Sequence, residues 1–171
     1  MSDNSERHLL KFMVTSAVCF FIGTVHGVLQ VIRPVRAWLD SIGSPYGGPG
    51  HMIDPLAHAH INTVGGVVIF LMGATYYLIP RMGKLKSMYS EKLVTHTYWW
   101  TTLGIAGFYS TLMIFGTWEG LNIMDPERVQ EIHKIYGPVI SIVSTAMGIG
   151  FWVYFANIYL TVKQIRKKDA P

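Results

Sequence analysis

This sequence has few charged residues and a single cysteine. Only 14% of its 171 residues are charged and 50% are hydrophobic, whereas an ordinary soluble domain has about 25% charged residues. Water is therefore not expected to be the main solvent of its surface. The lone Cys19 excludes an internal disulfide, a paired-cysteine metal site and a covalently attached c-type heme. Because Cys19 lies in an apolar run, we expect a small buried core residue.

The sequence also shows little of the pattern expected for a strongly basic face or for a removable leader. Its formal charge of +4 is too small to argue for nucleic acid, and no basic stretch is interleaved with aromatic residues. The N-terminal stretch MSDNSERHLLK is mixed in charge, and no small-residue cleavage site follows the first apolar run. We therefore expect the first helix to be retained in one domain over residues 1–171.

Long apolar runs are what the sequence has instead. They cover residues 12–32, 58–80, 95–118 and 136–162, and each reaches the roughly 20 residues that a bilayer core requires. Because the backbone in lipid must satisfy its own hydrogen bonds, these runs are predicted to be helices. The expected fold class is all-α, an integral membrane four-helix bundle.

The connections between the runs differ in composition. The segment 33–57 is rich in Gly and Pro, which favours a turn-rich loop over a fifth span. Near the start of the last run, Asp125 followed by Pro126 predicts a helix start with a capping side chain.

Positive charge predicts the orientation. With the N-terminus inside, ten of the fourteen Lys and Arg residues lie on the cytoplasmic side and four lie outside. The excess of Lys and Arg in cytoplasmic segments favours this orientation. We therefore expect both termini in the cytoplasm, and a multi-pass protein of the bacterial inner membrane.

Histidine is the most informative residue type in this chain. Imidazole is costly in hydrocarbon unless it has a partner, so a histidine within a span is a functional-site hypothesis. Five of the seven histidines map to the outer half or outer edge under the predicted topology, namely His26, His51, His58, His60 and His133. A membrane b-type cytochrome needs two imidazoles from different helices at similar depth. The clustering therefore predicts heme b, with interhelical hydrogen bonding as the alternative.

The choice of ligands follows from spacing. His58 and His60 are two residues apart, so they point to nearly opposite sides of a helix and cannot both bind one iron axially. His60 is preferred because Gly65 and Gly66 follow it, and small residues let a macrocycle or a neighbouring helix approach. For the opposite ligand we prefer His26, with His133 as the competitor, and His58 with His133 would form another site. Close helix packing remains the alternative role of the glycines.

Two arginines stand where the anionic propionates of an outer-facing heme would lie. Arg33 and Arg36 follow the first run directly, and charged donors are the usual partners of such anions. Their alternative role is to anchor the helix end at the interface. Asp54, which precedes the HAH triplet, is a candidate acceptor that would fix a histidine tautomer.

At the second run the sequence reaches a recognisable string, DPLAHAHINTVGGVVIFLMGATYYLIPRM. It resembles the second transmembrane helix of the catalytic subunit of heme-copper oxidases, and particularly of nitric oxide reductases and their cytochrome c oxidase relatives. The residues that carry the resemblance are His60, Asn62, Gly73, Ala74, Tyr76, Tyr77 and Pro80. The resemblance implies that His60 ligates the low-spin heme. The family's remaining ligands come from later helices, so it implies no centre that reduces oxygen or nitric oxide.

The expected function is therefore that of a membrane-anchored b-type cytochrome subunit rather than a complete enzyme. It would transfer electrons between the quinone pool or a periplasmic redox partner, such as a cytochrome c, and a larger respiratory complex. We expect it to contact lipid and to associate with other subunits or as a homo-oligomer, using small-residue faces around Gly104, Gly107, Gly148 and Gly150. The alternative function is a non-redox accessory or assembly subunit of an oxidase or reductase complex.

Overall fold

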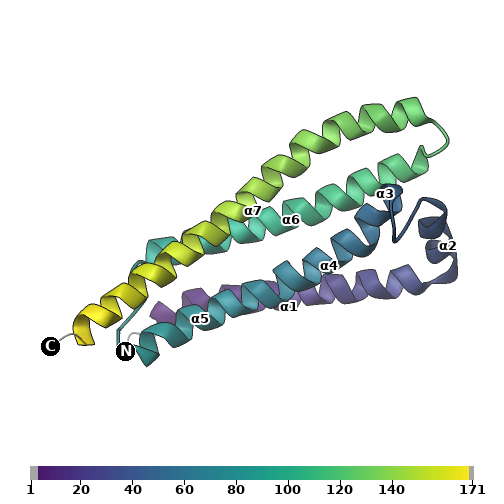
Figure 1. Cartoon of the computed structure of the whole chain (residues 1–171). Helices are drawn as coiled ribbons and strands as arrows, with labels where there is room; N and C mark the ends of the chain where they lie inside the picture. Colours follow the sequence, from purple (N-terminus) through teal and green to yellow (C-terminus); the bar gives the residue numbers. More distant parts are fainter. Residues whose placement is uncertain (1–3, 170–171) are drawn as a thin grey trace.

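The computed structural model of the chain describes residues 4–169, which are almost entirely helical (Figure 1). Long helical segments run beside one another. They are α1 (Asn4–Val31), the segment Gly48–Met82, which we call the second rod, α6 (Glu91–Leu121) and α7 (Pro126–Asp169). No strand is assigned in residues 4–169. The all-α prediction is therefore confirmed. The start of α1 and the end of α7 lie at the same end of the bundle.

The second rod is helical along most of its length, with a kink at Asp54. It comprises α3 (Gly48–His51), η1 (Met52–Ala57), α4 (His58–His60), η2 (Ile61–Val68) and α5 (Ile69–Met82). Before the HAH triplet, η1 contains the kink, whereas η2, directly after the triplet, is π-helical. Such wide turns occur preferentially at functional sites.

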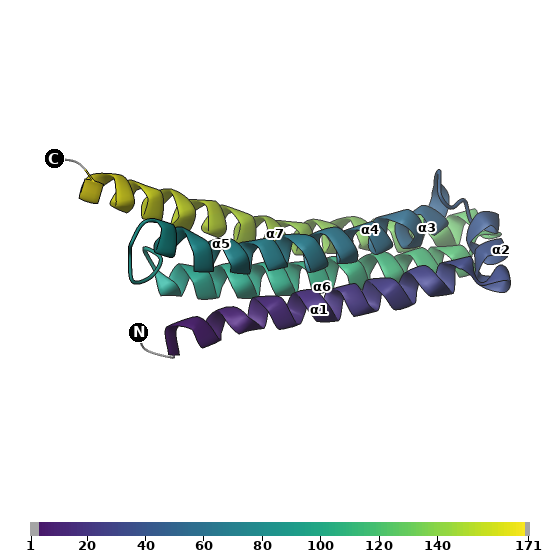
Figure 2. The same cartoon turned by 90° about the horizontal axis from the view of Figure 1, so that it is seen from below.

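The segment 33–57 was predicted to be a loop, and this prediction was wrong. The helix α2 (Arg33–Ser41) occupies its first part, and the second rod already begins at Gly48. Pro34 lies in the first turn of α2, where a missing N–H is tolerated. Ser41 is followed by the turn 42–47, so α2 lies across one end of the rods (Figure 2). We call this the α2 end.

Three of the long helices are apolar enough to cross a membrane, by length and composition, within the described part of the chain. They are Leu9–Val31, Gly48–Met82 and Pro126–Lys168. The predicted span 95–118 lies inside α6, which is long but carries several threonines, tyrosines and tryptophans. Thr97 and Thr101 are fully buried, so part of the polar surface of α6 faces the other helices, while Thr95 and His96 are exposed.

Close helix contacts hold the bundle together at glycines. At the seam between α1 and the second rod, a Cβ on Gly65 would lie 2.8 Å from the sulfur of Cys19, which is itself buried as predicted. At the seam between α6 and α7, a Cβ on Gly104 would lie 2.5 Å from the Cα of Met147. Because glycine has no side chain, it allows the backbones to approach this closely.

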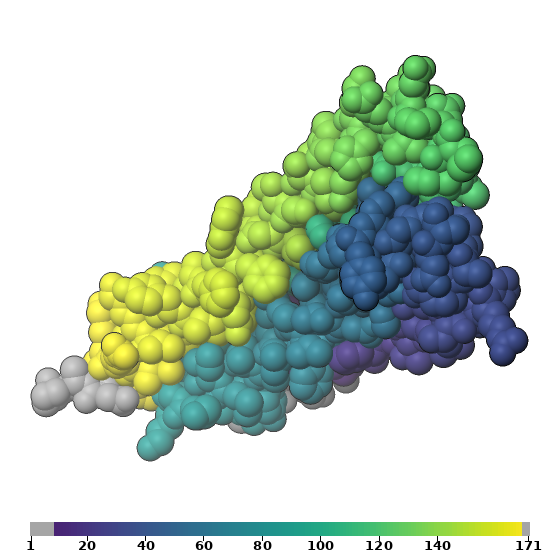
Figure 3. All heavy atoms as spheres, turned by 45° about the vertical axis from the view of Figure 1, so that its right-hand side comes forward, coloured from purple at the N-terminus to yellow at the C-terminus, as the bar shows by residue number. Residues whose placement is uncertain are grey.

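The start of α7 follows the sequence prediction. The carboxylate of Asp125 accepts a hydrogen bond from the backbone N–H of Arg128 at 3.0 Å, and Pro126 is the first helical residue. The predicted capping interaction is thus confirmed. Near the α2 end, the hairpin of α6 and α7 stands out from the rest of the body (Figure 3).

Candidate functional site

The histidines of the second rod point to different neighbours, as their two-residue spacing predicts. The ring of His58 faces α1, where its centroid lies 5.4 Å from that of His26. The ring of His60 faces α6 and lies 4.6 Å from the ring of Phe108. One iron therefore cannot bind both imidazoles axially.

His26 is buried, and both of its ring nitrogens have partners. Its Nε2 lies 3.0 Å from the side-chain nitrogen of Gln30, and its Nδ1 lies 3.3 Å from the hydroxyl of Tyr109. Gln30 donates its amide N–H to Nε2, so Nδ1 carries the proton that is shared with Tyr109. This arrangement satisfies a buried imidazole completely.

Beside His26 and His58, α1 and the second rod pack directly against each other. A Cβ on Gly27 would lie 3.0 Å from Nε2 of His58, and a Cβ on Gly23 would lie 2.2 Å from the side-chain oxygen of Asn62. These distances leave no space for a flat macrocycle between the two helices. The structure thus brings His26 to His58 and does not bring it to His60.

His60 has a different and more open environment. Its Nδ1 donates a hydrogen bond to the backbone carbonyl of Leu56 at 2.8 Å, and its side chain is half-buried. Because a carbonyl only accepts hydrogen bonds, the proton of the neutral ring must lie on Nδ1, and Nε2 carries the lone pair. A ligand histidine is typically oriented in this way, by a hydrogen bond from its other ring nitrogen.

His133 lies on α7, near the tip of the projecting hairpin. Its Nδ1 is 3.0 Å from a carboxylate oxygen of Glu119; the Glu119 side chain is only 3% exposed, whereas that of His133 is 59% exposed. The His133 ring also packs at 5.2 Å from the ring of Tyr136. His133 is thus held by α6 through Glu119, and the structure does not bring it to His58 or His60.

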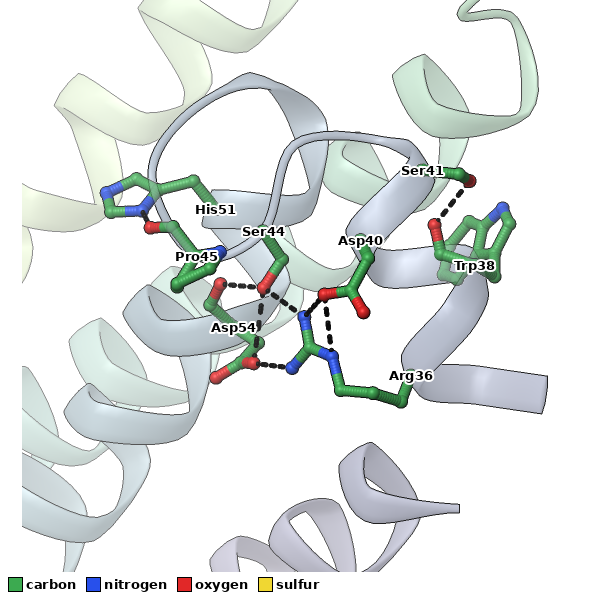
Figure 4. A network of polar contacts seen from close by, with 8 residues as sticks. All are labelled: Arg36, Trp38, Asp40, Ser41, Ser44, Pro45, His51 and Asp54. Carbon is green, nitrogen blue, oxygen red and sulfur yellow. Dashed lines mark hydrogen bonds and ion pairs between the residues drawn. The ribbon is translucent and has the colours of Figure 1, made fainter. Parts of the chain in front are cut away.

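Arg36 is already paired within the protein (Figure 4). Its guanidinium donates to Asp40 at 2.9 Å and to Asp54 at 2.5 Å, and it also donates to the hydroxyl of Ser44 at 2.8 Å. The hydrogen bonds to Asp40 and then to Asp54 raise the pKa of Arg36 further above its already high ordinary value. Arg33, by contrast, is exposed.

Asp54 and the glycines also have structural partners. Asp54 pairs with Arg36 rather than with a histidine ring. A Cβ on Gly65 or Gly66 would meet the side chain of Cys19 or Phe20 of α1, so these glycines admit a neighbouring helix. Gly104, Gly107 and Gly150 lie between α6 and α7 in the same way, while a Cβ on Gly148 would have no atom within 4 Å.

Several functional neighbours of the histidines were not predicted from the sequence. Gln30 follows His26 by four residues, a spacing that places the two side chains on one helix face. The sequence could therefore have predicted this contact. Tyr109 and Phe108 lie on α6, far along the chain from the histidines they contact. No local pattern identifies them.

Comparisons with known proteins match most of this chain. The sequence model of the family described as cytochrome c and quinol oxidase polypeptide I matches residues 4–139. The cytochrome c oxidase subunit 1 homolog of the Bradyrhizobium diazoefficiens bacteroid is 26% identical over 91% of this chain and 28% of its own length. The cbb3-type cytochrome c oxidase subunit CcoN1 of Stutzerimonas stutzeri is 25% identical over 66% of this chain and 22% of its own. The chain thus spans about a quarter of the length of these relatives.

Proposed function

This chain belongs to the family of cytochrome c and quinol oxidase polypeptide I, and on that premise we propose that it is an electron-transfer subunit that holds a b-type heme on His60. It is a membrane protein related to the respiratory oxidases. The observation that carries the proposal is the hydrogen bond from Nδ1 of His60 to the Leu56 carbonyl, which leaves Nε2 free to bind iron.

The residues around His60 fit a heme ligand in their chemistry. His60 is half-buried on a helix, its ring packs against Phe108, and Nε2 has the lone pair that iron requires. A heme held there would supply one-electron transfer at iron. The protein's part is to fix the tautomer, to orient the imidazole and to supply the apolar surroundings of α6.

We propose that a second residue, which would hold the heme together with His60, belongs to another chain. Both nitrogens of His26 are hydrogen bonded, and its ring lies against His58 on the other side of the second rod. His133 has its Nδ1 anchored as His60 does, but it lies near the tip of the hairpin, where it contacts Glu119 and Tyr136 rather than His60. Of the open possibilities, ligation in trans requires no repacking of these side chains. It also supports association with other subunits of a membrane complex.

The proposed membrane topology and location are those that the apolar runs and the distribution of Lys and Arg predict. The chain would cross the bacterial inner membrane four times with both termini in the cytoplasm, so that the α2 end lies outside. Its electron donor would be the quinone pool or a periplasmic cytochrome c, and its acceptor a larger respiratory complex. Arg33, which is exposed at the α2 end, stays our candidate partner for a propionate, whereas Arg36 has two carboxylates to neutralise.

The experiment is a heme assay on the complex purified from native membranes through a tag on this chain. A mild detergent should retain the other chains, and the pyridine hemochrome spectrum reports the heme type. We expect b-type heme that stays with the tagged chain. A colourless preparation that still contains partner subunits would reject the proposal.

That second result would favour a non-redox accessory or assembly subunit. The observation behind this alternative is the cluster of His26, Gln30, Tyr109 and His58, in which a buried imidazole is satisfied by other side chains of the same bundle. Histidines that only join helices need no cofactor. The heme assay separates the two functions directly.

A further inference from the structure

Arg36 joins α2 to the start of the second rod. It binds Asp40 on its own helix and Asp54 on the rod, and its side chain is only 31% exposed. Ser44 completes the connection, because its hydroxyl donates to the backbone carbonyl of Asp54 at 2.9 Å (Figure 4). Asp54 is therefore fixed through both its side chain and its backbone.

Asp54 is also the point where the second rod departs from helical geometry. Its backbone angles are φ −132° and ψ 112°, and Pro55 follows it. Leu56, only two residues further, offers the carbonyl that accepts the Nδ1 proton of His60. The direction of this carbonyl depends on how the rod continues after the interruption.

From this arrangement we infer that Arg36 is a positioning residue for His60. By holding Asp54, it sets the course of residues 54–56, so that the Leu56 carbonyl takes the proton of Nδ1 and Nε2 keeps its lone pair. The consequence for heme binding rests on the proposed function, while the consequence for the His60 tautomer does not. This role differs from contact with a propionate, since both acidic partners of Arg36 belong to the protein.

Two variants and a control test the inference on the full chain in detergent. Arg36→Gln removes the charge, and Asp54→Asn keeps the shape of its partner. Arg33→Gln is the control for the tautomer readout alone, which is recorded without heme, because Arg33 lies on the same helix and is exposed. The first readout is the ¹⁵N NMR spectrum of labelled histidine without added heme, with the His60 signals assigned from their loss in His60→Ala.

We expect the wild type and Arg33→Gln to hold His60 as the Nδ1–H tautomer, and Arg36→Gln to give a mixture of tautomers. The second readout is titration of the purified complex with hemin. Arg36→Gln should bind hemin about tenfold more weakly than the wild type, since losing a hydrogen-bond partner of a ligand histidine typically costs 10- to 100-fold in affinity. The hemin affinity of Arg36→Lys should lie between those of the wild type and Arg36→Gln. If Arg36→Gln does not fold, Asp54→Asn supplies the same comparison.

An unchanged His60 tautomer in folded Arg36→Gln or Asp54→Asn would overturn the inference, as would the same mixture in Arg33→Gln. A tautomer change without heme binding in any variant would uphold the role of Arg36 and reject the proposed function.

Discussion

At the residue scale, hydrogen bonding separates histidines that the sequence alone treats as equivalent. His26 has both nitrogens occupied, whereas His60 and His133 each have Nδ1 held by an acceptor. An imidazole with Nδ1 anchored in this way has its Nε2 lone pair free for iron. This difference arises from residues on other helices, so spacing along the chain does not reveal it.

The proposed ligand in trans leads to a prediction for His26→Met and His133→Met. If neither residue is an axial ligand, both variants should keep the spectrum and the reduction potential of the bound heme. Replacing an axial imidazole with a thioether would raise the potential. A redox titration of the purified complex measures this, and a raised potential in one variant alone would assign the second ligand to that residue.

At the element scale, glycines decide how closely the helices approach. We predict that Gly104→Val destabilises the protein by about 1–3 kcal/mol, the usual cost of overpacking a tight site, because a Cβ there would lie 2.5 Å from the backbone of Met147. Gly148→Val is the matched control, since a Cβ there meets no atom within 4 Å. Thermal unfolding in detergent should separate the two variants, and equal loss in both would contradict the described α6–α7 seam.

The Glu119–His133 contact should stabilise the α6–α7 hairpin. We predict that His133→Ala costs about 1–3 kcal/mol, because the carboxylate of Glu119 would be buried without its partner. Arg128→Ala should cost less than about 1 kcal/mol, since its pair with Glu131 is exposed. Denaturant unfolding gives both values. A smaller loss for His133→Ala than for Arg128→Ala would show that burial of Glu119 does not govern this contact.

Sequence reasoning was accurate for these elements wherever the determinants are local. The cap at Asp125 and the opposite directions of His58 and His60 depend on residues within a few positions. It was wrong for the segment 33–57, where Gly and Pro suggested a loop. Its helix α2 is stabilised by Leu39 and Ile42, which are buried against other elements, so its formation depends on tertiary packing.

At the scale of the whole molecule, the bundle resembles one part of a larger assembly. α7 runs along most of the length of the bundle. Only 6% of its apolar membrane-capable stretch is buried, against 39% for that of the second rod. The chain also spans about a quarter of the length of its relatives. These two facts agree with our proposal that other chains or lipid cover α7 and that heme binding is completed in a complex.

The reduced-minus-oxidised spectrum of the complex, recorded for wild type, His60→Ala and His58→Ala, tests the central claim most directly. We expect the sharp alpha band of a six-coordinate b-type heme in the wild type, its loss in His60→Ala and its retention in His58→Ala, because His58 faces His26 on the other side of the rod. All three proteins should remain inserted in the membrane. An unchanged alpha band in His60→Ala would contradict the assignment of heme to this residue.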